Sequence, residues 1–292
     1  MKDFRDKVVI ITGASSGIGE ALAYEFAALG ARVVVSARNF ERLTEVAERV
    51  GRISASVSRL SGPSRPPQSL RGPRTPSALA VACDVSREED CVALVDKTVA
   101  AFGAIDVLVC NAGVSMRALL DDVDVGVLHR LMDVNFWGTV YCTKYALPWL
   151  LRSRGSVVGV SSVAGLHGLP GRTGYSASKY AMTGFLETVR VENLHRGLHV
   201  MIACPGFTAT NVRLSALTAD GTPQGATPRE ESKMMSAGEV AYRIIGGISR
   251  RRRLLLMEFE GRATHWIKKF APSLLDKLFY KAMAREPDSP LK

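Results

Sequence analysis

The sequence lacks several features that would place it in other classes of protein. No apolar run approaches the roughly 18 residues that cross a bilayer. The polar residues 1–7 lead directly into an apolar segment, so we expect neither a membrane span nor a signal peptide. The five cysteines are odd in number and widely spaced, without a CxxC pair, which argues against a disulfide framework and a metal site. We therefore expect a cytoplasmic protein with reduced, mostly buried thiols and no metal.

Acidic residues are scarce in two stretches that account for the net charge of +10. Residues 51–78 contain five arginines and no acid, and residues 243–292 contain twelve lysines or arginines against five acids. The rest of the chain is close to neutral and has no basic recognition helix. This distribution disfavours nucleic-acid binding, the alternative that the charge first suggests. It favours solubility or peripheral contact with a membrane surface.

The chain has 292 residues, of which 47% are hydrophobic and 23% charged, as expected for one large globular domain. Apolar strand patterns alternate with helical patterns along it. We predict strands at residues 8–12, 32–36, 78–82, 107–110, 156–160, 198–203 and 254–257, and helices at 18–29, 40–50, 87–102, 134–151 and 174–195. This order predicts an α/β fold, a single doubly wound, Rossmann-type parallel sheet of seven strands with helices on both faces.

Three further segments divide the chain. Residues 51–77 are rich in proline, glycine, serine and arginine, and predict a flexible surface insertion between the second helix and the third strand; a docking role is the alternative. Residues 207–236 are polar and predict a mobile lid. Residues 261–292 follow the main domain, residues 1–260, as an amphipathic helical extension that is broken at Pro272.

A glycine-rich turn follows the first predicted strand. Glycines let the backbone approach a pyrophosphate, whose charge the amino terminus of the next helix would stabilise. The spacing is GxxxGxG, and a purely structural turn is the alternative. Its position between a strand and an amphipathic helix favours a dinucleotide site made by Gly13, Ser15, Ser16, Gly17, Ile18 and Gly19.

The end of the second predicted strand indicates which nucleotide binds. An acid there would bind the 2′-hydroxyl of the adenosine ribose and repel a 2′-phosphate. This chain has Ser36-Ala37-Arg38-Asn39 instead. Because a guanidinium pairs well with a phosphate, Arg38 and the missing acid favour NADP(H) over NAD(H), although an exposed arginine at such a place is ordinary.

A tyrosine and a lysine four residues apart, Tyr175 and Lys179, would lie on one helix face. Tyrosine is a poor acid-base catalyst at neutral pH because its pKa is about 10, and a fixed positive charge beside it would lower that value. An isolated YxxxK pair is weak evidence, since surface pairs of this kind are common.

Together with other motifs in the same order, these residues resemble the classical short-chain dehydrogenases/reductases over residues 6–206. Ser162 lies thirteen residues before Tyr175, a spacing that this family also shows. The other similarities are Thr12 to Gly19 with its TGxxxGxG turn, Asp84-Val85 with its adenine contact, Asn111-Ala112-Gly113 with its NAG motif, Asn135 with its catalytic Asn, and Pro205-Gly206, Thr208 and Thr210 with its nicotinamide loop. Ser16 stands where many NADP-preferring members have a second basic residue.

The resemblance implies a role for each of four residues. Tyr175 would exchange a proton with the substrate oxygen, and Lys179 would lower the pKa of Tyr175 and hold the nicotinamide ribose. Ser162 would polarise the substrate oxygen, and Asn135 would hold a water that connects Lys179 to solvent. We therefore expect residues 1–260 to form a single domain that both binds the cofactor and carries these four residues. Taken singly, Ser162 and Asn135 could simply cap a turn or helix.

The substrate side is less defined. In residues 264–281 aromatic and aliphatic residues interleave with lysines, which suits a surface helix on a membrane or, alternatively, one packed on the body or on a second subunit. This stretch, together with the Ser36-Ala37-Arg38-Asn39 turn, makes the chain similar to the family's branch that acts on hydrophobic carbonyls, including 3-ketodihydrosphingosine reductases and hydroxysteroid dehydrogenases. We expect an apolar ketone as substrate and a homodimer or homotetramer. A 3-oxoacyl thioester reductase and a non-catalytic NADP(H) sensor are the alternatives.

Overall fold

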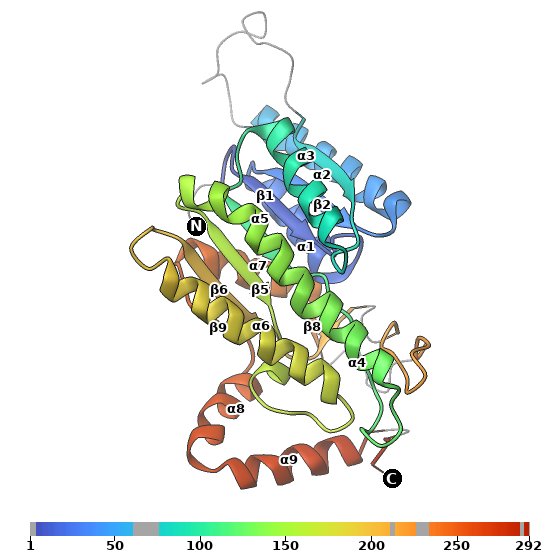
Figure 1. Ribbon diagram of the computed structural model, residues 1–292. Helices are drawn as coiled ribbons and strands as arrows, with labels where there is room; N and C mark the ends of the chain where they lie inside the picture. Colours follow the sequence, from blue (N-terminus) through green and yellow to red (C-terminus); the bar gives the residue numbers. More distant parts are fainter. Residues whose placement is uncertain (1–3, 61–75, 211–213, 226–233, 287–288, 292) are drawn as a thin grey trace, which may run out of the picture.

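The computed structural model describes residues 4–60, 76–210, 214–225, 234–286 and 289–291. Its centre is a parallel sheet of seven strands in the order β3-β2-β1-β4-β5-β6-β9 (Figure 1). The strands are β1 (Val8–Thr12), β2 (Arg32–Ala37), β3 (Ala78–Ala82), β4 (Val107–Cys110), β5 (Ser156–Val160), β6 (His199–Cys204) and β9 (Leu254–Leu256). The predicted fold is confirmed, with strand bounds within about a residue of those expected.

Helices cover both faces of this sheet and form two separate apolar cores. On one face lie α1 (Gly17–Ala28), α2 (Phe40–Leu60) and α7 (Ala237–Ser249). On the other lie α3 (Glu88–Phe102), α5 (Gly138–Arg152) and α6 (Thr173–Glu192). Strands buried on both faces explain the nearly continuous apolar runs in the sequence. The strand order reverses between β1 and β4, where folds of this kind bind their ligands.

Two predicted boundaries were wrong. Helix α2 continues to Leu60, so the first ten residues of the predicted insertion are helical. The reason lies in the spacing of Val50, Ile53 and Val57, since Val50 is buried and Ile53 packs against the same core. Residues 61–75 lie outside the described part of the chain. The helix expected from residue 134 begins earlier, as α4 (Val125–Met132) followed by a π-helical turn (Asp133–Trp137) that leads into α5.

The carboxyl-terminal extension forms two helices, α8 (Phe259–Phe270) and α9 (Pro272–Ala284), with the expected break at Pro272. They lie beyond the carboxyl ends of the central strands (Figure 1). Lys268 Nζ donates a hydrogen bond to Leu166 O at 2.7 Å, and the Phe279 ring stacks on His167 at 5.0 Å. Leu275 and Met283 are buried. The extension therefore packs on the segment that follows β5.

Two short strands, β7 (Thr208–Ala209) and β8 (Met235–Ser236), pair with each other at the two ends of the predicted lid. Residues 211–213 and 226–233 of that segment lie outside the described part. Within the described residues no helix has the length and apolar character that a membrane span requires. All five cysteines are free and buried, as expected.

Candidate active site

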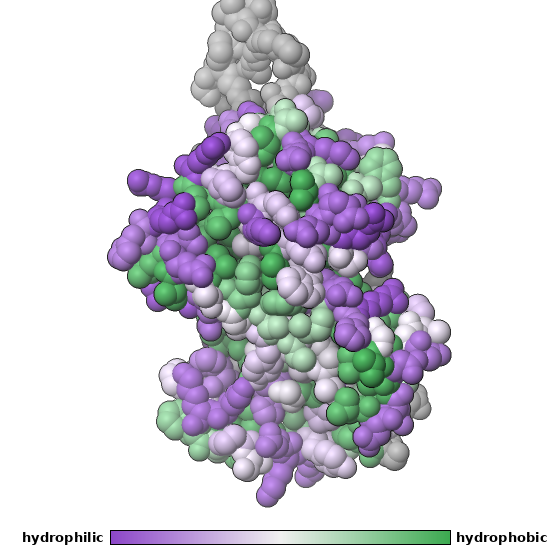
Figure 2. Space-filling view, in the orientation of Figure 1, coloured by the Kyte–Doolittle hydropathy of each residue, from purple (hydrophilic) through white to green (hydrophobic). Residues whose placement is uncertain are grey.

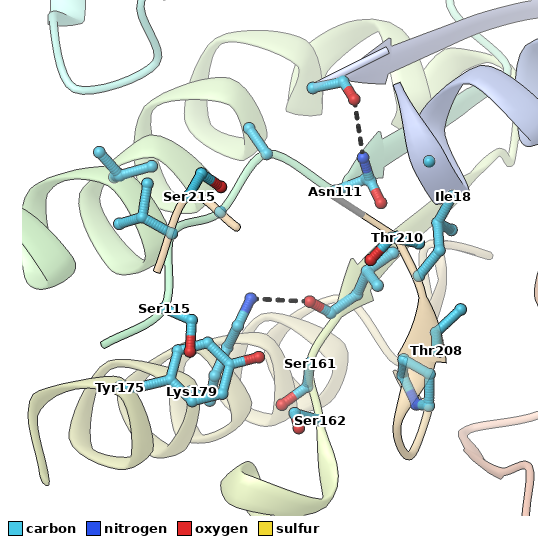
Figure 3. A pocket seen from close by; sticks show the side chains of 18 of the residues that line it. Ile18, Asn111, Ser115, Ser161, Ser162, Tyr175, Lys179, Thr208, Thr210 and Ser215 are labelled. Carbon is cyan, nitrogen blue, oxygen red and sulfur yellow. Dashed lines mark hydrogen bonds between the residues drawn. The ribbon is translucent and has the colours of Figure 1, made fainter. Parts of the chain in front are cut away.

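A cavity of about 730 Å³ opens at the carboxyl ends of the strands (Figure 3). All the site residues selected from the sequence line it except Gly19 and Asn135. The fold thus brings the glycine turn, the end of β2, the segment after β4, helix α6 and the Pro205–Gly206 turn to one chamber. Gly19 and Asn135 do not line it.

The glycine turn has the backbone geometry that its sequence predicts. Gly13 and Gly17 have positive φ values of 64° and 59°, a backbone conformation that is strained for residues with a side chain. A Cβ at Gly19 would collide with Gly13 O and with the Asn111 amide, so only glycine lets α1 begin this close to the strand. Ser16 is the N-cap of α1, and its side chain makes no capping bond. The turn therefore directs backbone N–H groups and the positive end of a helix at the cavity.

Asn111 braces this turn from the neighbouring strand. Its Nδ2 donates to Thr12 O at 2.9 Å and to Gly13 O at 3.2 Å. The hydroxyl of Thr12 accepts hydrogen bonds from the backbone N–H groups of Asn111 and Ala112, both at 3.0 Å. These bonds tie β1 to β4 where the strand order reverses, and they fix the floor on which a dinucleotide would lie.

Arg38 and Asp84 line the part of the cavity that follows the carboxyl ends of β2 and β3. Burial opposes ionisation of Asp84, but hydrogen bonds from the hydroxyl and N–H of Ser86 and the nearby charge of Arg38 lower its pKa. Arg38 itself is exposed at the end of β2. An exposed guanidinium beside a fixed carboxylate gives this end of the chamber both an anion-binding and a hydrogen-bond-accepting group.

Asn135 is fully buried in the π-helical turn and forms three hydrogen bonds. Its Nδ2 donates to Val114 O and to Ser178 Oγ, both at 2.9 Å, and its Oδ1 accepts from Val114 N at 2.8 Å. In this way it joins the segment after β4 to helix α6, one residue before Lys179. A Cβ at Gly113 would lie 3.0 Å from Asn135 Oδ1 and 3.4 Å from Lys179 Nζ, so the amide and the ammonium flank the same glycine.

Tyr175, Lys179 and Ser162 meet at the centre of the cavity (Figure 3). Lys179 Nζ lies 5.8 Å from the centre of the Tyr175 ring and donates to Val160 O at 2.9 Å. Burial lowers the pKa of Lys179 to about 8. Burial raises the pKa of Tyr175, which a hydrogen bond with Ser162 and the charge of Arg172 partly offset. Arg172, whose positive charge lowers the pKa of Tyr175, was not selected from the sequence.

Arg172 stands three residues before Tyr175, at the N-cap of α6, and is buried. Its Nη1 donates to Ser115 Oγ at 2.9 Å and to Met116 O at 3.4 Å, which fastens the segment after β4 to the start of α6. Its spacing from Tyr175, one helical turn, is a signal that could have found it. The other cavity residues that were missed include Ser115, Leu169, Glu258, Glu260, Thr264 and Phe279. Several come from the carboxyl-terminal extension, which no local motif connects with the site.

The Pro205–Gly206 turn closes the cavity near Ser162. Pro205 O accepts from Val163 N at 3.3 Å, and Thr208 Oγ1 donates to Gly206 O at 3.3 Å. A Cβ at Gly17 would lie 3.1 Å from the Thr210 methyl group, so the glycine turn and this loop approach each other across the chamber. Among the described residues no group of three His, Cys, Asp or Glu side chains could hold a metal ion.

Comparison with known proteins agrees with this geometry. The family model described as short chain dehydrogenase matches residues 7–70 and 63–220. The chain is 34% identical to 11-beta-hydroxysteroid dehydrogenase A of Sesamum indicum, over 98% of this chain and 79% of that protein. It is 32% identical to dehydrogenase/reductase SDR family member 7B of Mus musculus, over 96% of this chain and 81% of that protein.

Two solved structures have the same fold. A short chain dehydrogenase/reductase of Burkholderia phymatum in complex with NAD has a TM-score of 0.76 and 25% identity, covering 94% of this chain and 97% of that one. An alcohol dehydrogenase of Thermococcus sibiricus complexed with 5-hydroxy-NADP has a TM-score of 0.68 and 23% identity, covering 86% and 94%.

The fold and the cavity define an oxidoreductase of the nicotinamide-binding kind. The chain belongs to the short chain dehydrogenase family, with a likeness to hydroxysteroid dehydrogenases. The residues present also fit a nicotinamide dinucleotide, because the glycine turn lines the cavity without side chains at Gly13 and Gly17 and directs a helix amino terminus at the chamber.

Proposed function

We propose that this protein is an NADP(H)-dependent oxidoreductase that moves a hydride between the nicotinamide and a carbonyl group or secondary alcohol, and that it reduces a hydrophobic ketone. The observation that supports this most is that Tyr175, Ser162 and Lys179 share one cavity with the glycine turn. Leu169, Val163 and Phe279 add an apolar wall to that cavity. A chamber with a proton donor, a dinucleotide site and apolar walls suits an apolar carbonyl compound.

The bound nicotinamide would supply or accept the hydride. Tyr175 would donate a proton to the substrate oxygen during reduction, and Ser162 would polarise that oxygen by a hydrogen bond. Lys179, with its pKa lowered to about 8, would hold the ribose hydroxyls and exchange a proton near neutral pH. Asn135 would hold a water beside Lys179 that leads to solvent, in addition to the three bonds it already makes.

The preference for NADP(H) rests on Arg38. Arg38 lines the cavity directly after β2, and the end of that strand, Ser36-Ala37, carries no acid that would bind the ribose 2′-hydroxyl and repel a 2′-phosphate. The Thermococcus sibiricus relative was solved with 5-hydroxy-NADP and the Burkholderia phymatum relative with NAD, so likeness alone leaves both nucleotides open. Oxidation of NADPH and NADH should be followed in parallel.

The experiment that tests the function is NADPH oxidation against a panel of ketones: steroids, 3-keto sphingoid bases, and 3-oxoacyl thioesters for the fatty-acid alternative. We expect the steroid-like or long-chain ketones to be reduced, in keeping with the named relative 11-beta-hydroxysteroid dehydrogenase A. Tyr175→Phe should lower turnover by about 10² to 10⁴-fold while nucleotide binding persists. A protein that binds NADPH yet reduces none of the ketones would instead support the sensor alternative.

Contact with a membrane surface is a second part of the proposal. Phe259, Trp266, Phe270, Leu274, Leu278 and Tyr280 are exposed on α8 and α9, near Lys268, Lys269, Lys277 and Lys281. Figure 2 shows hydrophilic and hydrophobic residues mixed at the end of the molecule where these helices lie. Such a surface suits anionic lipid. Flotation with phosphatidylserine vesicles should show binding that Trp266→Ser with Phe270→Ser weakens, whereas Phe40→Ser, on the distant α2, should not.

We also propose a homodimer or homotetramer that assembles through α5 and α6. Trp137, Val191 and Leu194 leave apolar surface exposed on and beside these helices. Light scattering after gel filtration would give the mass, and a monomer at micromolar concentration would contradict the proposal. A cytoplasmic location, at or near a membrane surface, stays a prediction that fractionation of cells can test.

A further inference from the structure

The proposed reaction does not use the two carboxylates that line the cavity from the carboxyl-terminal part of the chain, Glu258 and Glu260. Glu258 lies two residues beyond β9 and precedes α8. Its side chain lines the cavity, as do Thr264 of α8 and Phe279 of α9. The carboxyl-terminal part of the chain therefore contributes acidic groups as well as the apolar ring of Phe279 to the cavity wall.

The position of the Glu258 carboxylate relates it to the reacting groups. It lies directly over Gly206, so that a Cβ at Gly206 would collide with Glu258 Oε2. Through Pro205 O, the same turn accepts a hydrogen bond from Val163 N, the residue after Ser162. Glu258 is thus next to the turn that borders the catalytic serine, on the side where the extension covers the cavity.

The protein itself does little to satisfy this carboxylate. Among the described residues none donates a hydrogen bond to the side chain of Glu258, and it does not cap α8. Burial raises its pKa and the Glu260 carboxylate raises it further. Arg243 lowers it, yet Arg243 bonds to Glu239 at 2.6 Å and to Met257 O. A half-buried carboxylate that receives no hydrogen bond from the protein is available to a donor on a bound ligand.

We propose that Glu258 is a specificity-determining residue that binds a protonated amino group on the carbonyl substrate. This inference rests on the proposed reduction and narrows its substrate to an amphiphilic amino ketone, or the corresponding amino alcohol. The apolar walls at Val163 and Leu169 would hold the aliphatic part. The ring of Phe279 would add a cation–π contact. A charged hydrogen bond of this kind favours the cation about tenfold or more over a neutral group.

Matched substrates test the inference. The probes are long-chain alkyl ketones with a primary ammonium on the first, second or third carbon from the carbonyl, each paired with the same chain bearing methyl in place of ammonium. We expect kcat/KM with NADPH to favour one ammonium ketone over its methyl partner by at least about tenfold in the wild type. Glu258→Gln, which keeps the shape against Gly206, should lower that ratio about tenfold. Glu192→Gln, an exposed acid at the far end of α6, should leave it unchanged.

Three outcomes would overturn the inference, and they are distinguishable. If the wild type reduces both members of each pair equally well, Glu258 does not select the amine, while the proposed function stands. If Glu258→Gln slows both members equally, with an unchanged thermal unfolding midpoint, Glu258 acts on the nucleotide or the turn rather than on the amine. If no ketone is reduced by the wild type, the proposed function fails and the inference fails with it.

Discussion

Replacing Asn135 with alanine tests whether this residue braces the site or only serves proton transfer. The substitution removes hydrogen bonds to Val114 N, Val114 O and Ser178 Oγ. At about 1 kcal/mol for each lost bond, we expect the free energy of unfolding to fall by about 3 kcal/mol. The segment after β4 would lose its tie to α6, so turnover should fall as well.

Urea unfolding measures the stability change, provided that the slope of free energy against urea stays the same in both proteins. The matched control is Asn193→Ala, another buried asparagine, which bonds to Val189 O at 2.8 Å and to Arg196 Nη1 at 3.1 Å at the far end of α6. It should cost about 2 kcal/mol and leave kcat unchanged. If Asn135→Ala lowers kcat but costs less than about 1 kcal/mol, the bracing role is refuted and a role in proton transfer alone remains.

Substitutions of three other residues probe the charges of the site. Arg38→Ala should raise the KM for NADPH about tenfold or more and leave that for NADH unchanged, and an equal rise for both would remove Arg38 from nucleotide selection. Arg172→Met should raise the pKa of Tyr175, so the acidic limb of the pH–rate profile for alcohol oxidation should move to higher pH. Arg172→Lys keeps the positive charge and should move this limb less, and an unmoved limb in Arg172→Met would contradict the assignment. Lys179 titrates at about 8 when folded and near 10.5 when unfolded, so the unfolded chain binds more protons between these values. The free energy of unfolding of the wild type should therefore rise by up to about 3 kcal/mol relative to that of Lys179→Met as pH rises from 8 to 10.5. If urea unfolding gives both proteins the same dependence of stability on pH, Lys179 is not desolvated.

The sheet and the glycine turn could be predicted because their determinants are local. Strands buried on both faces are short apolar runs, and α1 can begin at Gly17 only if Gly19 is small. The end of α2 was predicted too early because proline and glycine further along were given more weight than Ile53 and Val57, which continue the helical spacing.

The missed parts of the site depend on contacts between distant segments. Glu258 and Phe279 reach the cavity because α8 and α9 fold back over the segment after β5, an arrangement held by Lys268 and His167. No periodicity in the sequence indicates that packing. The π-helical turn at Asn135 also has no local signal, because its extra residue is accommodated by the bonds that Asn135 makes to Val114 and Ser178.

The two apolar cores differ in their cysteine content, so the reactivity of the thiols reports on partial opening of one face of the sheet. All five cysteines, Cys83, Cys91, Cys110, Cys142 and Cys204, belong to the apolar cluster under α3, α5 and α6, and none belongs to the cluster under α1, α2 and α7. A thiol reagent in native buffer would therefore not detect the separation of α1 or α7 from the sheet. It would react only when the layer that holds the catalytic helix lifts, so its rate measures how often that one side of the sheet is uncovered.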